Sequence, residues 1–178
     1  MFSVVLIGGY AISTLTGMLS SDIVMAYREN RSMERILDRL ANHIVVIGFG
    51  AIGRLVAGQL KSAGTAVLVV DRDATLAGQA SELGHLVVQG DPGVDPGVLD
   101  RARVEHAKAL VVTTEDPDRK LAITLMAHTL QPDLRIVVTG QNDPRGTLLQ
   151  RAGASEVVVV DDLVAGALVD RLGRHAAT

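Results

Sequence analysis

Short apolar runs rich in Val, Ile and Leu recur along most of the chain and alternate with helical segments. They cover residues 43–48, 66–71, 85–89, 108–113, 134–139 and 156–160. Each run is nearly continuous rather than alternating, which is typical of parallel strands buried on both faces of a sheet. The pattern therefore predicts an α/β fold: a Rossmann-like, doubly wound, parallel six-stranded sheet with strand order 3-2-1-4-5-6.

The segments between these runs carry recognisable helix ends. Gly64 follows the first helical segment, where a residue with positive φ is favoured. Three further helices are expected to begin at Asp-Pro pairs, where Asp caps free N–H groups and Pro has no N–H to leave unpaired. These pairs are Asp95-Pro96, Asp116-Pro117 and Asp143-Pro144.

The first 21 residues carry no charged side chain. A helix of that length spans about 31 Å, enough to cross a hydrocarbon core of about 30 Å. We therefore predict a membrane-spanning helix over residues 1–21. A buried helix of a soluble protein is the alternative, and a signal peptide fits poorly because no basic region or small-residue cleavage site is present.

Residues 22–42 combine charged positions with one apolar stripe, Met33, Ile36, Leu37 and Leu40. This pattern predicts an amphipathic linker helix, which alternatively docks on its own domain. Arginines beside the apolar segment place this side in the cytoplasm, so we expect a plasma (inner) membrane protein whose residues after about 22 are cytoplasmic. The predicted division is 1–21, 22–42 and 43–178.

Composition narrows the class of protein. The 178 residues allow one domain with short additions. A net charge of -3 gives no positive field for a phosphate backbone, so no nucleic-acid partner is expected. The absence of cysteine removes disulfides, thiolate metal sites and cysteine nucleophiles.

The first strand-to-helix turn reads Gly48-Phe49-Gly50-Ala51-Ile52-Gly53 and matches G-x-G-x-x-G. In this motif the first Gly allows the tight turn, the second lets the backbone approach a pyrophosphate, and the third lets helix and strand pack closely. The anion then lies on the helix N-terminus. The turn follows a predicted strand and opens a predicted helix, which is the context that dinucleotide binding requires.

Asp71 ends the second run, 18 residues beyond Gly53. An acid at this position accepts hydrogen bonds from ribose hydroxyls and repels a 2′-phosphate. Asp71 therefore favours NAD(H), or another adenine nucleotide such as ADP or ATP, over NADP. Arg72 leaves an alternative open, because a guanidinium there can pair with a 2′-phosphate or stack on adenine.

A catalytic apparatus is missing from the nucleotide fold. Hydride transfer needs a proton donor or acceptor near the nicotinamide, whereas Tyr10 and Tyr27 precede the fold and the five histidines show no metal-type pairing. His43 and His85 begin strands and are interpreted as structural. We predict a nucleotide sensor with no enzymatic activity and no metal site. The alternatives are a small NAD(P)-dependent oxidoreductase with a partner-supplied substrate site, and a structural adaptor without ligand.

Four segments carry a family resemblance: residues 43–50, Gln89-Gly90-Asp91, residues 107–114, and Arg151-Ala152-Gly153-Ala154. From 43 to about 160 the chain resembles the N-terminal regulator of potassium conductance domain, also called TrkA-N or KTN, of potassium channels and transporters. Residues 1–42 resemble the end of a channel's inner pore helix and the linker below it, with Gly8-Gly9 near the gating hinge.

The resemblance implies a cytoplasmic regulatory module that forms a homodimer or a larger ring, acts on a potassium-channel or transporter pore, and couples nucleotide binding to gating through the linker. It places phosphate contacts on Gly48 through Gly53, the ribose contact on Asp71, and adenine contacts on Arg72 and Asp91. Capping of its own loop is the alternative for Asp91. Thr113 is expected to flank the crevice.

The sequence departs from this family in two places. Lys120 stands where the family often has an Asn, so the role of that Asn does not carry over. No pore helix precedes the apolar segment, so we expect either the lower part of a channel or a separate subunit.

Glu115, Asp116 and Asp118 could bind calcium, but acidic residues also suit a helix N-terminus.

Overall fold

The computed structural model describes residues 36, 37, 39–141 and 145–175, with side chains described as far as Leu172. The predicted membrane helix 1–21 and most of the predicted linker helix 22–42 lie outside these residues. Within the described part of the chain, no helix is both long and apolar enough to cross a bilayer. The chain divides between Arg39 and Leu40, and every element named below follows that division. The boundaries at 21 and 42 remain predictions.

One six-stranded sheet forms the centre of residues 40–175 and confirms the predicted strand order, β3-β2-β1-β4-β5-β6. All its strand pairs are parallel. The strands are β1 (Ile44–Ile47), β2 (Val67–Asp71), β3 (Leu86–Gln89), β4 (Ala109–Val112), β5 (Arg135–Gly140) and β6 (Glu156–Val159). The central strands are buried, which explains their continuous apolar sequence.

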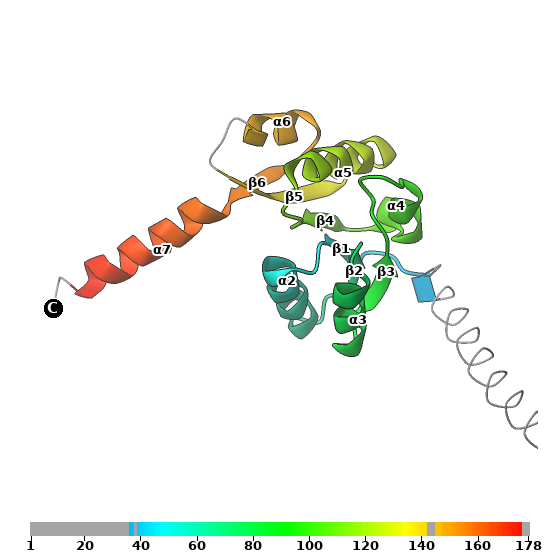
Figure 1. Ribbon diagram of the computed structural model, residues 1–178, viewed down its shortest axis with the longest axis horizontal. Helices are drawn as coiled ribbons and strands as arrows, with labels where there is room; N and C mark the ends of the chain where they lie inside the picture. The colour runs from blue at the N-terminus through cyan, green and yellow to red at the C-terminus, as the bar shows by residue number, and fades with distance from the viewer. Residues whose placement is uncertain (1–35, 38, 142–144, 176–178) are drawn as a thin grey trace, which may run out of the picture. The chain divides into compact units, whose positions relative to one another are not determined.

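Helices cover both faces of the sheet (Figure 1), as expected for a doubly wound fold. They are α2 (Ala51–Ser62), α3 (Ala74–Glu82), α4 (Gly97–Arg101), α5 (Pro117–Leu130), α6 (Arg145–Arg151) and α7 (Val160–His175). Helices α2 and α3 lie on one side, α4, α5 and α6 on the other, and α7 leads away from the end of β6. The winding reverses between β1 and β4, so the carboxyl ends of these strands should flank a ligand crevice.

The observed helix ends follow the predicted chemistry with one shift. Gly64 has φ 77° beyond the end of α2, and the Thr65 N–H donates to the Leu60 carbonyl as in a Schellman motif. Asp116 caps α5, whose first residue is Pro117. Helix α4 begins at Gly97, one residue later than expected, because Pro96 serves as its N-cap. The pair Asp143-Pro144 lies outside the described residues.

The two histidines at strand starts are structural, as predicted. His43 is fully buried, and its Nε2 donates to the Ala102 carbonyl over 3.0 Å. The ring of His85 meets the Phe49 ring edge-on, with the ring centres 5.7 Å apart. Burial is the main reason why the pKa of each imidazole lies below its usual value. Both side chains are therefore neutral packing groups at neutral pH.

Candidate functional site

Sheet register places three of the predicted site residues next to one another. Ile47 in β1 pairs with Val70 in β2 and with Val112 in β4. The residues that follow them are Gly48, Asp71 and Thr113, so these three lie side by side at the carboxyl edge of the sheet. The topology thus brings the predicted residues to the point where the winding reverses.

The glycine turn closes tightly on the ends of β1 and β4. Gly48 has φ 94°, and a Cβ there would lie 2.9 Å from the Thr114 nitrogen. A Cβ on Gly53 would overlap the Gly48 carbonyl oxygen and lie 2.7 Å from Thr113 Oγ1. That hydroxyl donates to the same Gly48 carbonyl over 2.8 Å. The first and third glycines therefore have the roles that the motif predicts, and Thr113 secures the turn.

The N-terminus of α2 is open to solvent. Its N-cap, Gly50, offers no side-chain acceptor, and the first turn holds no acidic residue. A Cβ on Gly50 would meet no atom within 4 Å. Such a helix end attracts an anion, because its N–H groups and the helix dipole both favour negative charge.

The neighbouring helix α3 is closed instead by its own cap. Asp73 accepts hydrogen bonds from the backbone N–H groups of Leu76 and Thr75. These hydrogen bonds hold the pKa of the Asp73 carboxyl below its usual value. An anionic ligand is therefore expected at α2 and not at α3.

Asp71 is fixed in place by the backbone on either side of it. One carboxylate oxygen accepts the Phe49 N–H over 2.6 Å, and the other accepts the Asp73 N–H over 2.8 Å. Each oxygen keeps a further lone pair, so the carboxylate can still accept hydrogen bonds from a ligand hydroxyl. The Phe49 ring itself is fully buried in the core. The sequence did not reveal that Phe49 uses its N–H to position Asp71.

A crevice of about 620 Å³ joins these groups. Its size suits a small-molecule ligand. Among the predicted site residues, its lining includes Gly48, Gly50, Ala51, Ile52, Asp71, Arg72 and Thr113. Phe49 and Gly53 lie beneath this lining and shape the turn.

Asp91 lines a smaller adjoining hollow of about 50 Å³, together with Asp71 and Arg72. One Asp91 oxygen accepts the Gly93 N–H over 3.0 Å, so Asp91 does cap its own loop. Its other oxygen forms an ion pair with Arg119. The Nε of Arg119 also lies 2.9 Å from an Asp116 oxygen. The loop after β3 is thereby tied to the start of α5.

The role of Arg119 at the crevice is not apparent from the sequence motifs. The spacing between Asp116 and Arg119 is that of neighbours on a helix surface and could have indicated their contact. Contact with Asp91 depends on the fold and has no sequence signal.

Glu115 and Asp116 lie directly before α5, and Asp118 lies in its first turn. Among the described residues, no three His, Asp or Glu side chains are placed to hold a metal ion. Asp116 accepts the N–H groups of Asp118 and Arg119 as the N-cap. The helix-terminus interpretation therefore holds for Asp116, and the geometry gives the calcium alternative no support.

Comparison with known proteins shows the family. The TrkA-N domain model matches residues 44–160. The chain belongs to the TrkA-N domain family, as the resemblance suggested.

Several relatives have names that describe potassium transport. The chain is 29% identical over 134 residues to potassium channel protein 1 of Methanocaldococcus jannaschii, covering 74% of this chain and 40% of that protein. It is 32% identical over 97 residues to a Trk system potassium uptake protein TrkA homolog of Pyrococcus horikoshii, covering 54% and 42%. The chain thus spans less than half of either relative.

Solved structures show the same fold with nucleotides bound. The GsuK channel bound to NAD has a TM-score of 0.62 and 28% identity, over 83% of this chain and 29% of that chain. GsuK bound to ADP has a TM-score of 0.62 and 27% identity, over 84% and 43%.

Proposed function

We propose that this chain is a nucleotide-sensing regulatory module of a potassium channel or potassium uptake system. The observation that carries the proposal is the pairing, in one crevice, of the open N-terminus of α2 with the Asp71 carboxylate. An adenine nucleotide needs both groups, because its phosphate is an anion and its ribose carries hydroxyl donors. The potassium-transport relatives and the NAD- and ADP-bound GsuK structures support the same conclusion.

In this proposal the ligand lies across the carboxyl ends of β2 and β1. Its phosphate oxygens accept hydrogen bonds from the backbone N–H groups of residues 50–53. Its ribose hydroxyls donate hydrogen bonds to the Asp71 carboxylate. Arg72, which lines both hollows, contacts the adenine together with the loop at Asp91. NAD(H) fits best, with ADP or ATP as further ligands, because a 2′-phosphate would approach the Asp71 carboxylate.

The proposed role is regulatory and not catalytic. Among the described residues, no histidine or tyrosine lines the crevice. These side chains, which commonly transfer protons, are therefore not placed to assist hydride transfer there. Potassium-transport relatives also favour regulation over the oxidoreductase alternative.

Strand β1 offers a short route between the nucleotide and the predicted linker. Asn42, just before β1, has φ 56°, and its N–H donates to the His106 carbonyl over 2.9 Å. Gly48 follows the other end of the same strand. A strand of four residues spans about 13 Å. A displacement of the glycine turn would therefore be transmitted along β1 to Asn42, where the predicted linker ends. Only a ligand with different affinities for two arrangements could drive such a change.

A charge placed on the first turn of α2 tests nucleotide binding. Ala51 is exposed and is the first residue of the helix. We expect Ala51→Asp to weaken NAD+ binding by about tenfold or more, because the carboxylate repels the phosphates at close range. The helix itself should gain about 0.3–1 kcal/mol from an acid in its first turn. Isothermal titration calorimetry measures the affinity and thermal unfolding the stability.

Ala51→Asn is the matched control, since it has nearly the same shape without the charge. It should bind NAD+ almost as tightly as the parent chain. Equal affinities for the Asp and Asn variants, or no binding of NAD+, ADP or AMP to the parent chain, would contradict the proposed site.

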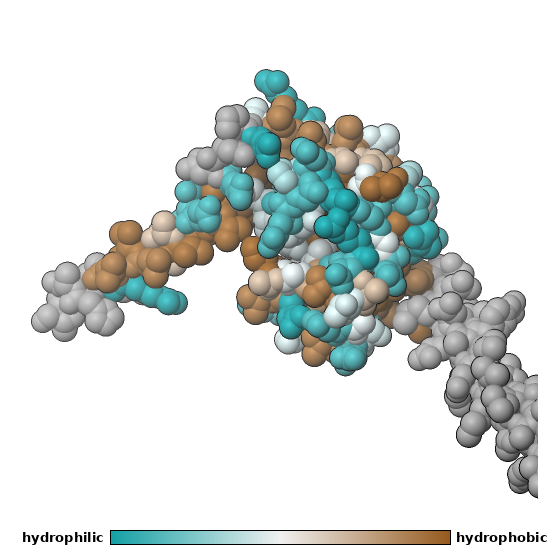
Figure 2. All heavy atoms as spheres, in the orientation of Figure 1, coloured by the Kyte–Doolittle hydropathy of each residue, from teal (hydrophilic) through white to brown (hydrophobic). Residues whose placement is uncertain are grey.

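We further propose that the module forms a homodimer or larger ring and that α7 supplies contact surface. Leu163, Leu168, Val169 and Leu172 on α7 are 56–74% exposed, and apolar side chains follow this helix in Figure 2. Exposed apolar surface of this kind favours burial between chains. Attachment to the membrane through residues 1–21, with the remainder in the cytoplasm, belongs to the same proposal, as does a potassium-transport pore as partner.

A charge on this helix should change the oligomeric state. We expect Leu168→Glu to shift the mass measured by light scattering from dimer or ring towards monomer. Leu83 is similarly exposed, at 54%, but follows α3. Leu83→Glu should therefore leave the mass unchanged, and a monomeric parent chain would rule out self-association.

A further inference from the structure

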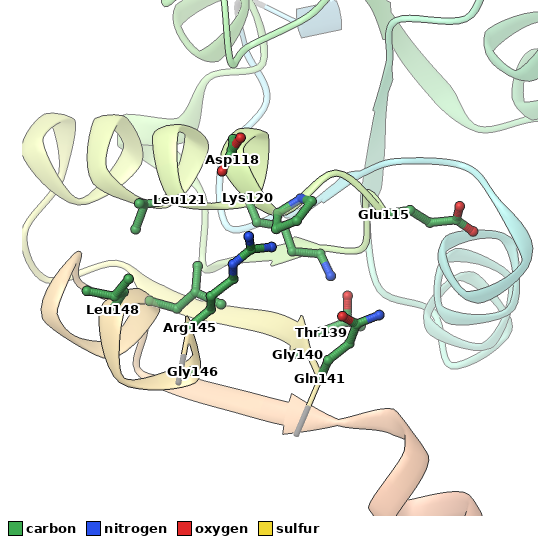
Figure 3. A pocket seen from close by; sticks show the side chains of 12 residues that line it. Glu115, Asp118, Lys120, Leu121, Thr139, Gly140, Gln141, Arg145, Gly146 and Leu148 are labelled. Atoms are coloured by element: carbon green, nitrogen blue, oxygen red, sulfur yellow. The ribbon is translucent and has the colours of Figure 1, made fainter. Parts of the chain in front are cut away.

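Beyond the glycine turn, the crevice reaches the carboxyl end of β5. The N-termini of α5 and α6 lie next to it. A second hollow of about 70 Å³ opens there (Figure 3). Five residues line both it and the main crevice: Glu115, Lys120, Thr139, Gly140 and Gln141. The two hollows therefore adjoin each other along these residues.

Two cationic side chains from different helices meet this extension. Lys120 lies in the first turn of α5 and is half-buried, and Arg145 is the first residue of α6 and is exposed. In Figure 3 the Lys120 ammonium points towards the end of β5 near Gln141, and the Arg145 guanidinium points towards α5. Each also interacts with other groups of the chain, which can hold it in position.

The acidic residues of this hollow are placed less centrally. Figure 3 shows the carboxylates of Glu115 and Asp118 at its margins, and both residues are exposed. Water screens an exposed charge more strongly than a half-buried one. The half-buried Lys120 is therefore screened less than Glu115 and Asp118, and the Gln141 amide adds hydrogen-bonding capacity beside it.

We propose that Lys120, supported by Arg145, forms a second anion subsite and that this subsite selects ligands with a second phosphate group. The inference rests on the proposed nucleotide site. A first phosphate on the N-terminus of α2 would lie in the same crevice whose lining includes Lys120. A monophosphate engages the α2 end alone, whereas the β-phosphate of ADP or of a dinucleotide engages both the α2 end and Lys120. Its charge-assisted hydrogen bond then adds affinity.

The test compares AMP with ADP on the full chain by calorimetry. The parent chain should bind ADP more tightly than AMP. Lys120→Gln should lower ADP affinity by about tenfold, the value of one hydrogen bond to a charged group, and should leave AMP affinity nearly unchanged. Arg145→Gln should have the same effect to a smaller degree, and Lys120→Arg should retain the preference for ADP.

The control variants remove one lysine or one arginine that lies far from the crevice. Lys108 is exposed and precedes β4, and Arg135 is exposed and begins β5. Both lie at the opposite, amino edge of the sheet, so Lys108→Gln and Arg135→Gln should change neither affinity.

The outcomes separate this inference from the proposed function. If AMP and ADP bind equally to the parent chain, or if Lys120→Gln leaves their affinity ratio unchanged, the second subsite is wrong while the nucleotide site stands. If neither nucleotide binds the parent chain, both are wrong.

Discussion

Gly53→Ala is expected to lower the free energy of unfolding more than alanine at either of the other two glycines of the turn, Gly48 and Gly50. The new Cβ would overlap the Gly48 carbonyl oxygen, which is backbone and cannot move aside as a side chain can. Helix α2 would have to shift away from β1 and from the Thr113 hydroxyl that secures the turn. Overpacking costs typically about 1–3 kcal/mol, and a clash with backbone predicts a loss at the upper end of that range. Urea unfolding followed by circular dichroism measures the loss.

Gly58 in the same helix gives the matched control. A Cβ there would meet no atom within 4 Å. Gly58→Ala should raise the free energy of unfolding by about 0.5–1 kcal/mol, because alanine loses less backbone entropy in a helix. If both variants changed stability in the same direction by similar amounts, the close packing of α2 on the turn would be refuted.

Asp71→Asn is expected to remove most of the affinity for NAD+. The carboxylate now accepts the N–H groups of Phe49 and Asp73 with its two oxygens. An amide has one oxygen, so its NH2 group must face one of these N–H donors and cannot accept a hydrogen bond from a ribose hydroxyl. Loss of a charged acceptor predicts roughly a ten- to hundredfold lower affinity. NADP+ should lose much less, because the charge that repels its 2′-phosphate is gone.

The control for Asp71 is an acid of equal charge away from the crevice. Asp133 is exposed in the turn before β5. Asp133→Asn should leave both affinities as they are in the parent chain, and thermal unfolding should show that all variants remain folded. Unchanged NAD+ binding in folded Asp71→Asn protein would show that Asp71 does not contact the ribose.

The strands and the glycine turn could be predicted because their signals are local. Continuous Val, Ile and Leu runs specify strands covered on both faces, and six such runs with short helical connections leave few allowed topologies. Glycine positions are equally informative: Gly48 and Gly53 occupy places where a Cβ does not fit. Asp71 could be predicted because a parallel strand directly beside β1 must end next to that turn.

Other features depend on which surfaces the fold brings together. The ion pair between Asp91 and Arg119 joins a loop after β3 to α5, and no spacing in the sequence connects them. Asp91 caps its own loop and pairs with Arg119, while its contact with adenine stays a prediction. Helix α2 buries Gly53 and Ala57, whereas the larger Leu55 is 65% exposed. Close approach to the sheet selects the small residues for the buried face.

Amide chemical shifts of the 15N-labelled chain, recorded during titration with NAD+, locate the nucleotide site residue by residue. We expect the largest changes at Gly50, Ala51, Ile52 and Gly53, with further changes at Asp71 and Arg72, since these line or support one crevice. Residues at the amino ends of the strands, such as Lys108 and Arg135, should remain unchanged. Shifts confined to that opposite edge, or no shifts at saturating NAD+, would contradict a nucleotide site at the α2 N-terminus.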